Sequence, residues 1–196
     1  MNPWQSLRAQ YPWPVEPPAV PLRLEGVNSG WFAGQNADVL KALLVGKTRV
    51  LEIGAWLGLS TRFLADLVPE VVTIDHWLGS AEHVQLAPDL LPILYETFIH
   101  NCFEYRHKIC PVRASIENGI QIVADKGWYP EVIYLDASHE YKDVKRDLAL
   151  IKEYFPKSIL TGDDFCWPGV GQAVREYATE NNFEISIVEP TSWTLK

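Results

Sequence analysis

The sequence predicts an α/β domain with a doubly wound, mostly parallel seven-stranded sheet and an antiparallel C-terminal hairpin. From residue 36 onward, five short apolar runs alternate with segments of helical spacing. This order is expected for parallel strands that carry helices on both faces of the sheet. The last two apolar runs, 183–188 and 191–195, are joined by a tight turn at Glu189 and Pro190. So short a link makes neighbouring strands antiparallel, because parallel strands need a long crossover.

The individual elements follow from the same pattern. Residues 49–53 form an apolar run before a glycine turn, so we expect a buried strand there. Further strands are expected at 71–74, 108–112, 131–135 and 158–161. Helices are expected at 37–44, 60–67, 89–106, 115–126, 141–154 and 170–181. Asn36 is placed to cap the first helix, which stops at Gly46, and Pro92 is tolerated in the first turn of the third helix.

The N-terminal segment differs from the rest in its proline content. Residues 1–24 hold six of the fourteen prolines. Proline fixes φ and removes a backbone donor, so this segment is predicted to be an extended arm rather than a helix or an inner strand. Residues 25–196 are predicted to form a single domain, which suits a chain of 196 residues.

Charge and cysteine content narrow the classes of partner. The net charge is −8 and no cluster of Lys or Arg occurs, which argues against nucleic acid or an anionic membrane surface as the partner. No apolar run approaches the length of a membrane span, and the first residues lack the apolar core of a signal peptide. Three cysteines without a C-x-x-C pair favour reduced thiols and a cytoplasmic protein. A homodimer is left open.

The loop after the first strand is the main functional signal. Ligands of such sheets bind at the carboxyl ends of the strands, and the loop there has the spacing Glu52-x-Gly54-x-x-x-Gly58. NAD and FAD need a glycine at the middle of this turn, where the backbone approaches a pyrophosphate, but that position is Trp56. S-adenosylmethionine has no phosphate, and an acid such as Glu52 can bond its ammonium. The alternative is a glycine turn that holds no ligand.

Asp75 closes the second strand about twenty residues later, where an acid can bind ribose hydroxyls. NAD-dependent enzymes also carry an acid at this position, so Asp75 does not separate the two cofactors. A helix-capping role is the alternative reading.

Four segments together resemble class I methyltransferases. Val50–Thr61 resembles their motif I, and most closely that of the bacterial branch that includes macrolide-sugar O-methyltransferases. Asp75–Ser80 is similar to the D-x-W-x-G-S segment of that branch, and Leu135–Tyr141 and Gly162–Asp164 resemble its later motifs. The similarity spans roughly residues 30–180.

The resemblance implies a Rossmann-like methyltransferase fold and S-adenosylmethionine as the cofactor. The residues expected to bind it are Glu52, Gly54, Ala55, Trp56, Gly58, Ser60, Asp75, His76, Ala114 and Ser115. For Ser115, capping of the following helix is an equally good explanation.

Three carboxylates follow strands four and five, which are predicted to be neighbours in the sheet. Asp136, Asp163 and Asp164 would repel one another unless a cation lies between them. Hard oxygen ligands with open positions suit Mg²⁺, and the resemblance also implies acids at these places in metal-dependent O-methyltransferases. The alternatives are helix capping by Asp136 and a plain turn at the end of strand five. Many metal-free methyltransferases also carry an acid after strand four.

His139 and Asp136 are the predicted catalytic residues. A neutral imidazole can take the proton of a substrate hydroxyl, and a bound metal would lower the pKa of that hydroxyl. The D-x-x-H spacing also resembles the macrolide-sugar enzymes, which implies that His139 is the base. The alternative is a capping or surface histidine.

Aromatic residues and one long connection predict the acceptor pocket. The rings that fall in loops near the strand ends are Trp31, Phe32, Trp77 and Trp167, and as a group they predict a lid. The segment 78–88 is predicted to determine specificity, because it is longer than an ordinary connector.

We therefore expect an O-methyltransferase that acts on a small molecule such as a hydroxylated sugar or a phenol, assisted by a divalent metal. The alternatives are metal-free transfer, a non-catalytic S-adenosylmethionine-binding protein, and a nicotinamide-dependent oxidoreductase.

Overall fold

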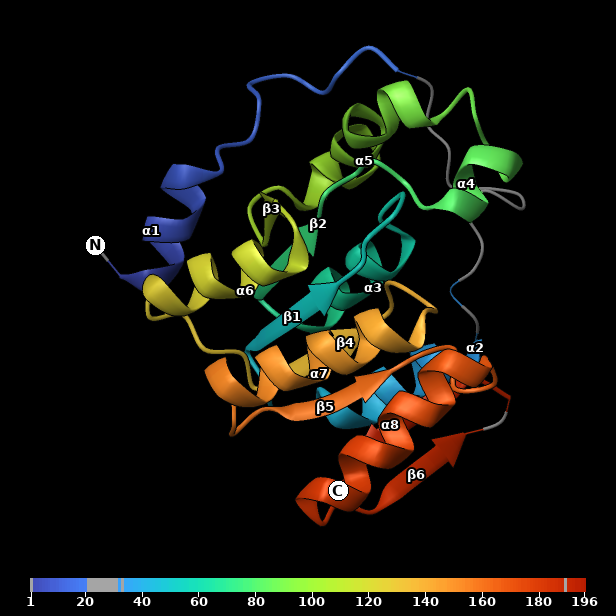
Figure 1. Cartoon of the computed structure of the whole chain (residues 1–196). Coiled ribbons are helices and arrows are strands. Elements are labelled where there is room, and N and C mark those ends of the chain that lie inside the picture. The colour runs from blue at the N-terminus through green and yellow to red at the C-terminus, as the bar shows by residue number, and fades with distance from the viewer. Residues whose placement is uncertain (1, 21–31, 33, 189) are drawn as a thin grey trace.

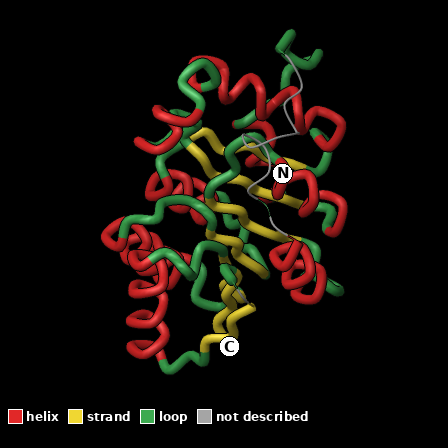
Figure 2. The backbone as a smooth tube through the Cα atoms, turned by 90° about the vertical axis from the view of Figure 1, so that its right-hand side faces the viewer, coloured by secondary structure: helices red, strands yellow, loops and turns green. Residues whose placement is uncertain are grey.

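The computed structural model describes residues 2–20, 32, 34–188 and 190–196, and its strands form a seven-stranded sheet in the order β3-β2-β1-β4-β5-β7-β6. Helices lie on both faces of this sheet (Figures 1 and 2). β7 is antiparallel to both of its neighbours, while the pairs among β1 to β5 are parallel. The predicted fold class is confirmed.

The strands agree with the predicted runs to within about two residues at each end. They are β1 Arg49–Ile53, β2 Glu70–Asp75, β3 Ile109–Arg113, β4 Val132–Leu135, β5 Ile159–Gly162, β6 Ile185–Val188 and β7 Ser192–Leu195. The α-helices are α1 Pro3–Gln10, α2 Gly34–Leu43, α3 Leu59–Leu67, α4 Ala81–Leu86, α5 Leu94–Cys102, α6 Ile116–Asp125, α7 Tyr141–Tyr154 and α8 Pro168–Asn181.

The strands bury side chains on both faces, which explains why their sequences are continuously apolar. Along β1, Leu51 and Ile53 pack into one hydrophobic cluster and Val50 into another. The first cluster also contains side chains of α1, α6, α7 and α8, and the second contains side chains of α2, α3 and α5. The sheet is therefore doubly wound, with α6, α7 and α8 on one face and α2, α3 and α5 on the other.

The strand register brings the ends of the central strands to one edge of the sheet. Ile53 of β1 lies opposite Ile74 of β2 and Leu135 of β4, and Leu135 lies opposite Gly162 of β5. The residues near these strand ends include Gly54, Asp75, Asp136 and Asp163. Four of the predicted site residues are thus placed along the same edge.

The prediction of an extended N-terminal arm is wrong for residues 3–10, which form α1. Pro3 occupies the first turn, where a missing N–H leaves no helical hydrogen bond unmade. Asn2 and Gln5 complete a capping box at the start of the helix, and Leu7 is fully buried in the core. Residues 11–20 are non-helical, as their prolines predict, and residues 21–24 lie outside the described part of the chain.

The predicted long helix 89–106 is divided in the structure. It consists of a 3₁₀ turn at Leu91–Ile93, the helix α5, and a second 3₁₀ turn at Phe103–Tyr105. Pro92 lies in the first turn, and proline disfavours α conformation in the residue before it. Within the predicted connection 78–88, the short helix α4 begins after Ser80, which forms a capping box with His83.

None of the helices formed by the described residues has the length and apolar character that a membrane span requires.

Removing the buried part of Leu7 tests whether α1 belongs to the folded unit. Leu7→Ala should lower the free energy of unfolding by about 2–4 kcal/mol, because the side chain is fully buried in the hydrophobic cluster that also contains Val123 and Trp128. Urea unfolding followed by circular dichroism measures this change. Val15→Ala is the control, because Val15 is 95% exposed, and it should change stability by less than about 0.5 kcal/mol. Equal stability of the two variants would show that α1 folds independently of the sheet.

Candidate active site

The loop between β1 and α3 has a backbone that only glycine can adopt at two positions. Gly54 has φ +90°, and a Cβ atom there would lie 1.8 Å from the carbonyl oxygen of Asp136. Gly58 has φ +87°, precedes the first residue of α3, and leaves no room for a Cβ beside the Sγ atom of Cys102. These glycines let the loop pass directly over the end of β4 and turn into the helix.

Trp56 also has a left-handed backbone, with φ +46°. Its indole stacks on the imidazole of His83 at 3.8 Å between ring centroids, and its carbonyl oxygen accepts a hydrogen bond from the indole of Trp77. The tryptophan that excludes a pyrophosphate site therefore connects the loop to α4.

The carboxylate of Asp75 fixes the conformation of this loop. One oxygen accepts hydrogen bonds from the amides of Ala55 and Trp56, at 2.9 and 3.1 Å, and the other accepts one from the amide of Trp77, at 2.7 Å. The sequence pattern did not reveal this role. These bonds already occupy three of the acceptor positions of Asp75, so fewer remain for the ribose of a cofactor. Contact between Asp75 and the ribose stays a prediction.

Glu52 is completely buried at the end of β1. Its carboxylate accepts hydrogen bonds from the hydroxyls of Ser60 and Thr61 in the first turn of α3. Burial raises the pKa of Glu52 to about 7, although these hydrogen bonds oppose the shift. Ser60 is therefore a partner of Glu52, and the predicted bond between Glu52 and the ammonium of the cofactor stays a prediction.

The remaining predicted cofactor residues lie beyond β2 and β3. His76 is half-exposed, and its Nδ1 accepts a hydrogen bond from the amide of Leu78. The amide of Ala114 donates to the carbonyl oxygen of Asp75. Ser115 caps α6, since its hydroxyl accepts a hydrogen bond from the amide of Asn118. The capping role of Ser115 is present, and its contact with the cofactor stays a prediction.

Asp136 and Asp163 form an acidic pair at the ends of β4 and β5. Loss of solvent contact raises the pKa of Asp136 well above its ordinary value, and the nearby charges of Asp163 and Asp164 raise it further. Burial likewise raises the pKa of Asp163. The hydroxyl of Tyr134 donates to Asp136 at 3.1 Å.

Asn36 is a site residue whose role the sequence did not predict. It was expected to cap a helix, but it lies inside α2 and is buried. Its amide nitrogen donates to the carboxylate of Asp163, and its amide oxygen accepts a hydrogen bond from Ser192 of β7. A short polar side chain in the middle of an apolar helix face was the available signal, because such groups are buried only with partners.

Asp164 is paired with His139. Their Nε2 and Oδ2 atoms are 2.8 Å apart, and Asp164 holds this position with a left-handed backbone, φ +63°. The imidazole also stacks on the indole of Trp167, with ring centroids 4.4 Å apart. Gly169 makes the stack possible, because a Cβ atom there would lie 2.3 Å from the carbonyl oxygen of His139. The structure therefore brings two predicted site residues together in a pairing that the sequence did not indicate.

The three aspartates provide the oxygen donors that Mg²⁺ prefers, but their present contacts do not make a ready metal site. Protein hydrogen bonds occupy both oxygens of Asp163, and His139 occupies one oxygen of Asp164. Among the described residues, no group of three or more His, Cys, Asp and Glu side chains is arranged so that it could hold a metal ion. The residues as placed do not fit a bound Mg²⁺, and its presence stays a prediction.

Of the aromatic residues predicted to form a lid, Trp77 belongs to the core instead. It is 1% exposed and packs against Tyr95 and Phe98, since its ring turns inward from the loop after β2. Phe32 packs against Phe63 and Tyr134, and Trp167 is 44% exposed beside His139. The prediction for Trp31 lies outside the described residues.

Comparison with known proteins identifies the family. A family model described as a methyltransferase domain matches residues 51–165, which is more than half of the chain. The chain therefore belongs to this methyltransferase family, and with its fold it is a class I S-adenosylmethionine-dependent methyltransferase. No curated protein sequence matches it significantly.

Three solved structures illustrate the shared fold. Precorrin 8w decarboxylase of Methanobacterium thermoautotrophicum has a TM-score of 0.61 and 13% identity, with 85% of this chain and 90% of that chain covered. CalS11, a calicheamicin methyltransferase, has a TM-score of 0.59 and 16% identity, with 98% and 91% covered. An O-methyltransferase from Bacillus cereus, in complex with SAH, has a TM-score of 0.55 and 15% identity, with 84% and 82% covered. At these identities the likeness concerns the fold.

Substituting Gly54 tests whether the loop geometry is required for cofactor binding. Gly54→Ala should weaken the affinity for S-adenosylhomocysteine by at least about tenfold, because the added methyl group meets the carbonyl oxygen of Asp136 and φ is positive. Calorimetric titration measures the affinity. Gly34→Ala is the matched control, since nothing lies within 4 Å of a Cβ atom there, and it should bind like the wild type. Unchanged affinity in Gly54→Ala would contradict this role for the loop.

The buried carboxyl group of Glu52 predicts a pH-dependent stability. A raised pKa means that the folded state binds the proton of Glu52 more tightly than the unfolded state does. The contribution of Glu52 to the free energy of unfolding is therefore greatest below the ordinary pKa of a glutamate, and it is lost as pH rises through about 7. Glu52→Gln removes this titration. The stability of the variant relative to the wild type should increase by about 2 kcal/mol between pH 5 and pH 8.

Urea unfolding at several pH values measures the difference between wild type and Glu52→Gln. Glu153→Gln is the control because Glu153 is exposed, and its difference from the wild type should not vary with pH. A constant difference for Glu52→Gln as well would show that the burial of Glu52 does not perturb its ionisation.

Proposed function

We propose that this methyltransferase acts on a hydroxyl group of a small molecule and that His139 accepts the hydroxyl proton. The observation that carries the proposal is the short contact between His139 and Asp164 at the carboxyl edge of the sheet. A carboxylate beside an imidazole holds the ring in one orientation and stabilises the imidazolium that forms when the proton arrives. Neutral hydroxyls are poor nucleophiles, so removal of this proton assists the attack.

The chain's own residues would have three tasks in the reaction. When bound, S-adenosylmethionine supplies a methyl group on a sulfonium, and the C–S bond electrons remain on sulfur as the C–O bond forms. The loop Gly54–Gly58, fixed by Asp75, would position this methyl group against the acceptor oxygen. His139 would receive the proton, while Asp164 and Trp167 would keep the imidazole in place.

The cofactor would lie along the ends of β1, β2 and β3. In this proposal the methionine part lies over Glu52, Gly54 and Ser60, and the adenosine part extends past Asp75 and His76 towards Ala114 and Ser115. The fold supports this placement, because ligands of doubly wound sheets bind where the strand order reverses, and β1 and β4 flank that position here.

The class of acceptor is part of the proposal. One structure of CalS11 describes it as a TDP-rhamnose 3′-O-methyltransferase, which acts on a sugar hydroxyl. In this chain, the half-exposed indole of Trp167 offers an apolar surface beside His139, and sugars and phenols both pack well on aromatic rings. A hydroxylated sugar or a phenol is therefore the acceptor class that we infer, with the segment 78–88 contributing to selectivity.

Assistance by Mg²⁺ is a separate hypothesis. A metal at Asp136, Asp163 and Asp164 would require Asp164 to release His139 and Asp163 to release Asn36. The contacts that are present favour proton transfer to His139 without such a rearrangement, so no step of the proposed reaction depends on the metal.

Substitution of His139 tests the proposed function. His139→Gln should lower kcat by about 10²–10⁴-fold, because the proposed base is removed. Asp164→Asn should lower kcat less, since the imidazole would remain without its charged partner. Formation of S-adenosylhomocysteine over a panel of sugars and phenols measures turnover. The affinity for S-adenosylhomocysteine, measured by calorimetry, should be unchanged in both variants.

His100→Gln is the matched control, because the imidazole of His100 bonds to the carbonyl oxygen of Pro18 and not to a group of the proposed site. Wild-type kcat in His139→Gln would contradict the proposed base. If none of the acceptors in the panel gave S-adenosylhomocysteine, a non-catalytic binding protein would be favoured. Tight binding of NAD would favour an oxidoreductase. Wild-type turnover unaffected by EDTA would exclude the metal, whereas loss restored by Mg²⁺ would establish it.

A further inference from the structure

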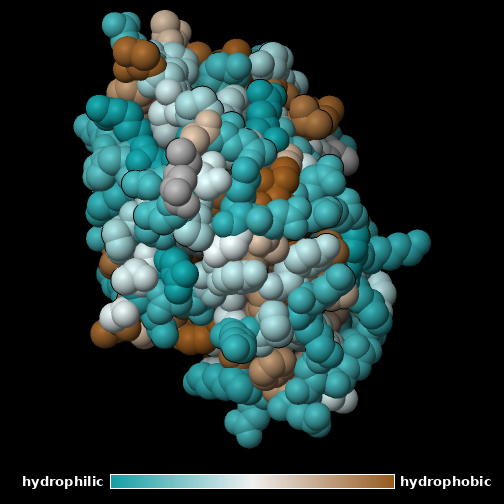
Figure 3. Space-filling view, turned by 90° about the vertical axis from the view of Figure 1, so that its left-hand side faces the viewer, coloured by the Kyte–Doolittle hydropathy of each residue, from teal (hydrophilic) through white to brown (hydrophobic). Residues whose placement is uncertain are grey.

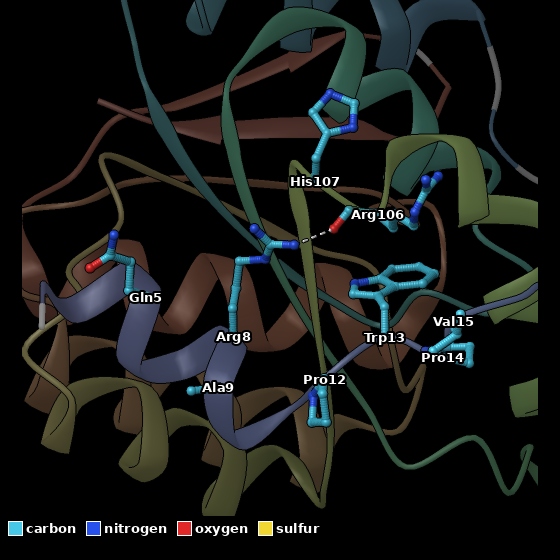
Figure 4. Close-up of a pocket in the computed structure, with 9 residues that line it drawn as sticks. All are labelled: Gln5, Arg8, Ala9, Pro12, Trp13, Pro14, Val15, Arg106 and His107. Carbon is cyan, nitrogen blue, oxygen red and sulfur yellow. Dashed lines mark hydrogen bonds between the residues drawn. The ribbon is translucent and has the colours of Figure 1, made fainter.

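A pocket lies near the amino end of β3, at the edge of the sheet away from the candidate active site. It has a volume of about 580 Å³ and is lined by α1, the segment after it, and the residues that precede β3 (Figure 4). The lining residues are Gln5, Arg8, Ala9, Pro12, Trp13, Pro14, Val15, Arg106 and His107. The volume is in the range of small-molecule sites.

The N-terminal segment that forms one wall is bound firmly to the body of the protein. Trp13 donates its indole N–H to the carbonyl oxygen of Ile109 at 2.8 Å, and Arg8 donates to the carbonyl oxygen of Arg106 at 2.9 Å. Leu7, between these contacts and the start of α1, is fully buried. The pocket is therefore a built feature of the fold rather than a gap beneath a loose arm.

The charge of the lining is opposite to that of the whole protein. The chain has a net charge of −8, yet the lining includes two arginines and a histidine and no Asp or Glu. Among the described residues, no carboxylate lies within ion-pair distance of Arg8 or Arg106, and the buried Nε of Arg8 has no hydrogen-bond partner. A buried donor without an acceptor is costly, so the hydrogen-bonding capacity of the Arg8 guanidinium is not fully met by the described residues.

The two arginines are held in place before any ligand arrives. The guanidinium of Arg106 lies 4.4 Å from the ring centroid of Phe103 and donates to the carbonyl oxygen of the same residue. Trp13 packs edge-to-face on Phe103, so one ring supports both the cation and the indole. In Figure 4, Trp13 and Pro14 lie on one side of Arg8 and Gln5 on the other. Planar guanidinium groups held this way suit the paired oxygens of phosphate or carboxylate.

We propose that this pocket binds a small organic anion. Its phosphate or carboxylate group lies against Arg8 and Arg106, and its flat apolar part lies on Trp13 between Pro12 and Pro14. The surrounding face is mostly hydrophilic with scattered apolar side chains, so the apolar wall is local to the pocket (Figure 3). The site is distinct from the cofactor loop, because it lies at the amino end of β3 and the loop lies at the carboxyl end of β1.

Calorimetric titration with phenyl phosphate tests the proposal, because this probe joins an anion to an aromatic ring. We expect binding at millimolar concentrations or below, weaker binding of inorganic phosphate, and no binding of benzyl alcohol. Benzoate distinguishes a carboxylate site from a phosphate site. Saturating S-adenosylhomocysteine should leave the affinity unchanged, and competition between the two would overturn the location.

Arg8→Met and Arg106→Met should each weaken binding of phenyl phosphate by about tenfold or more, because each removes a charge-assisted hydrogen bond. They lie on different elements, so misfolding of one leaves the other informative, and circular dichroism checks both. Trp13→Leu should reduce only the preference for phenyl phosphate over inorganic phosphate. Arg175→Met is the matched control, because Arg175 also lies over an aromatic ring, that of Phe165, but on α8. Equal affinity in all four variants, or no binding to the wild type, would overturn the proposal.

Discussion

The carboxylate of Asp75 accepts hydrogen bonds from three backbone amides, and the shape of the loops at the carboxyl ends of β1 and β2 depends on them. Two of the amides belong to the loop after β1 and one belongs to the loop after β2, so a single side chain joins both loops. This arrangement allows Trp56 to keep a left-handed backbone, which an unsupported tryptophan would rarely adopt. Close contact between Gly54 and the carbonyl oxygen of Asp136 then fixes the distance between this loop and β4. This part of the carboxyl edge of the sheet is thus held in shape by contacts within the protein itself.

Consecutive aspartates after β5 have different roles because the chain reverses between them. Asp163 is directed into the protein, where Asn36 binds it and where Ser192 in turn binds Asn36, so α2, β5 and β7 are joined through one polar chain. Asp164, with its left-handed backbone, is directed to His139 instead. This network holds the start of α2 close to the end of β5, while the imidazole of His139 lies next to the half-exposed indole of Trp167. The two aspartates that first indicated a metal are therefore engaged separately, Asp163 in a link between elements and Asp164 in a pairing with His139.

Most regular elements could be predicted from the sequence, whereas most side-chain partners could not. Continuous apolar runs fixed the strands, and the register then placed Gly54, Asp136 and Asp163 at one edge, as expected from parallel pairing. The proline content wrongly predicted an extended arm where α1 forms. A helix tolerates Pro3 in its first turn, and the other prolines of this segment come after the end of the helix. The pairing of His139 with Asp164 depends on the positive φ of Asp164, a non-glycine residue. The spacing of apolar residues in the sequence does not predict such a backbone conformation. Trp77 illustrates the same limit, since its position in a site-facing loop did not determine whether its ring points inward or outward.

The docking of α1 has a consequence for how the protein reaches its native state. Arg8 and Trp13 bond to residues 98 and 96 positions later in the chain. During synthesis α1 emerges before its partners at the start of β3, which follow after about a hundred residues. Synthesis of that stretch takes roughly 5–20 s at ordinary elongation rates. During that interval the apolar side chains of α1 have no partner at the start of β3 to pack against. Its short capped helix can form locally, but this long loop cannot close before the residues at the start of β3 have been made.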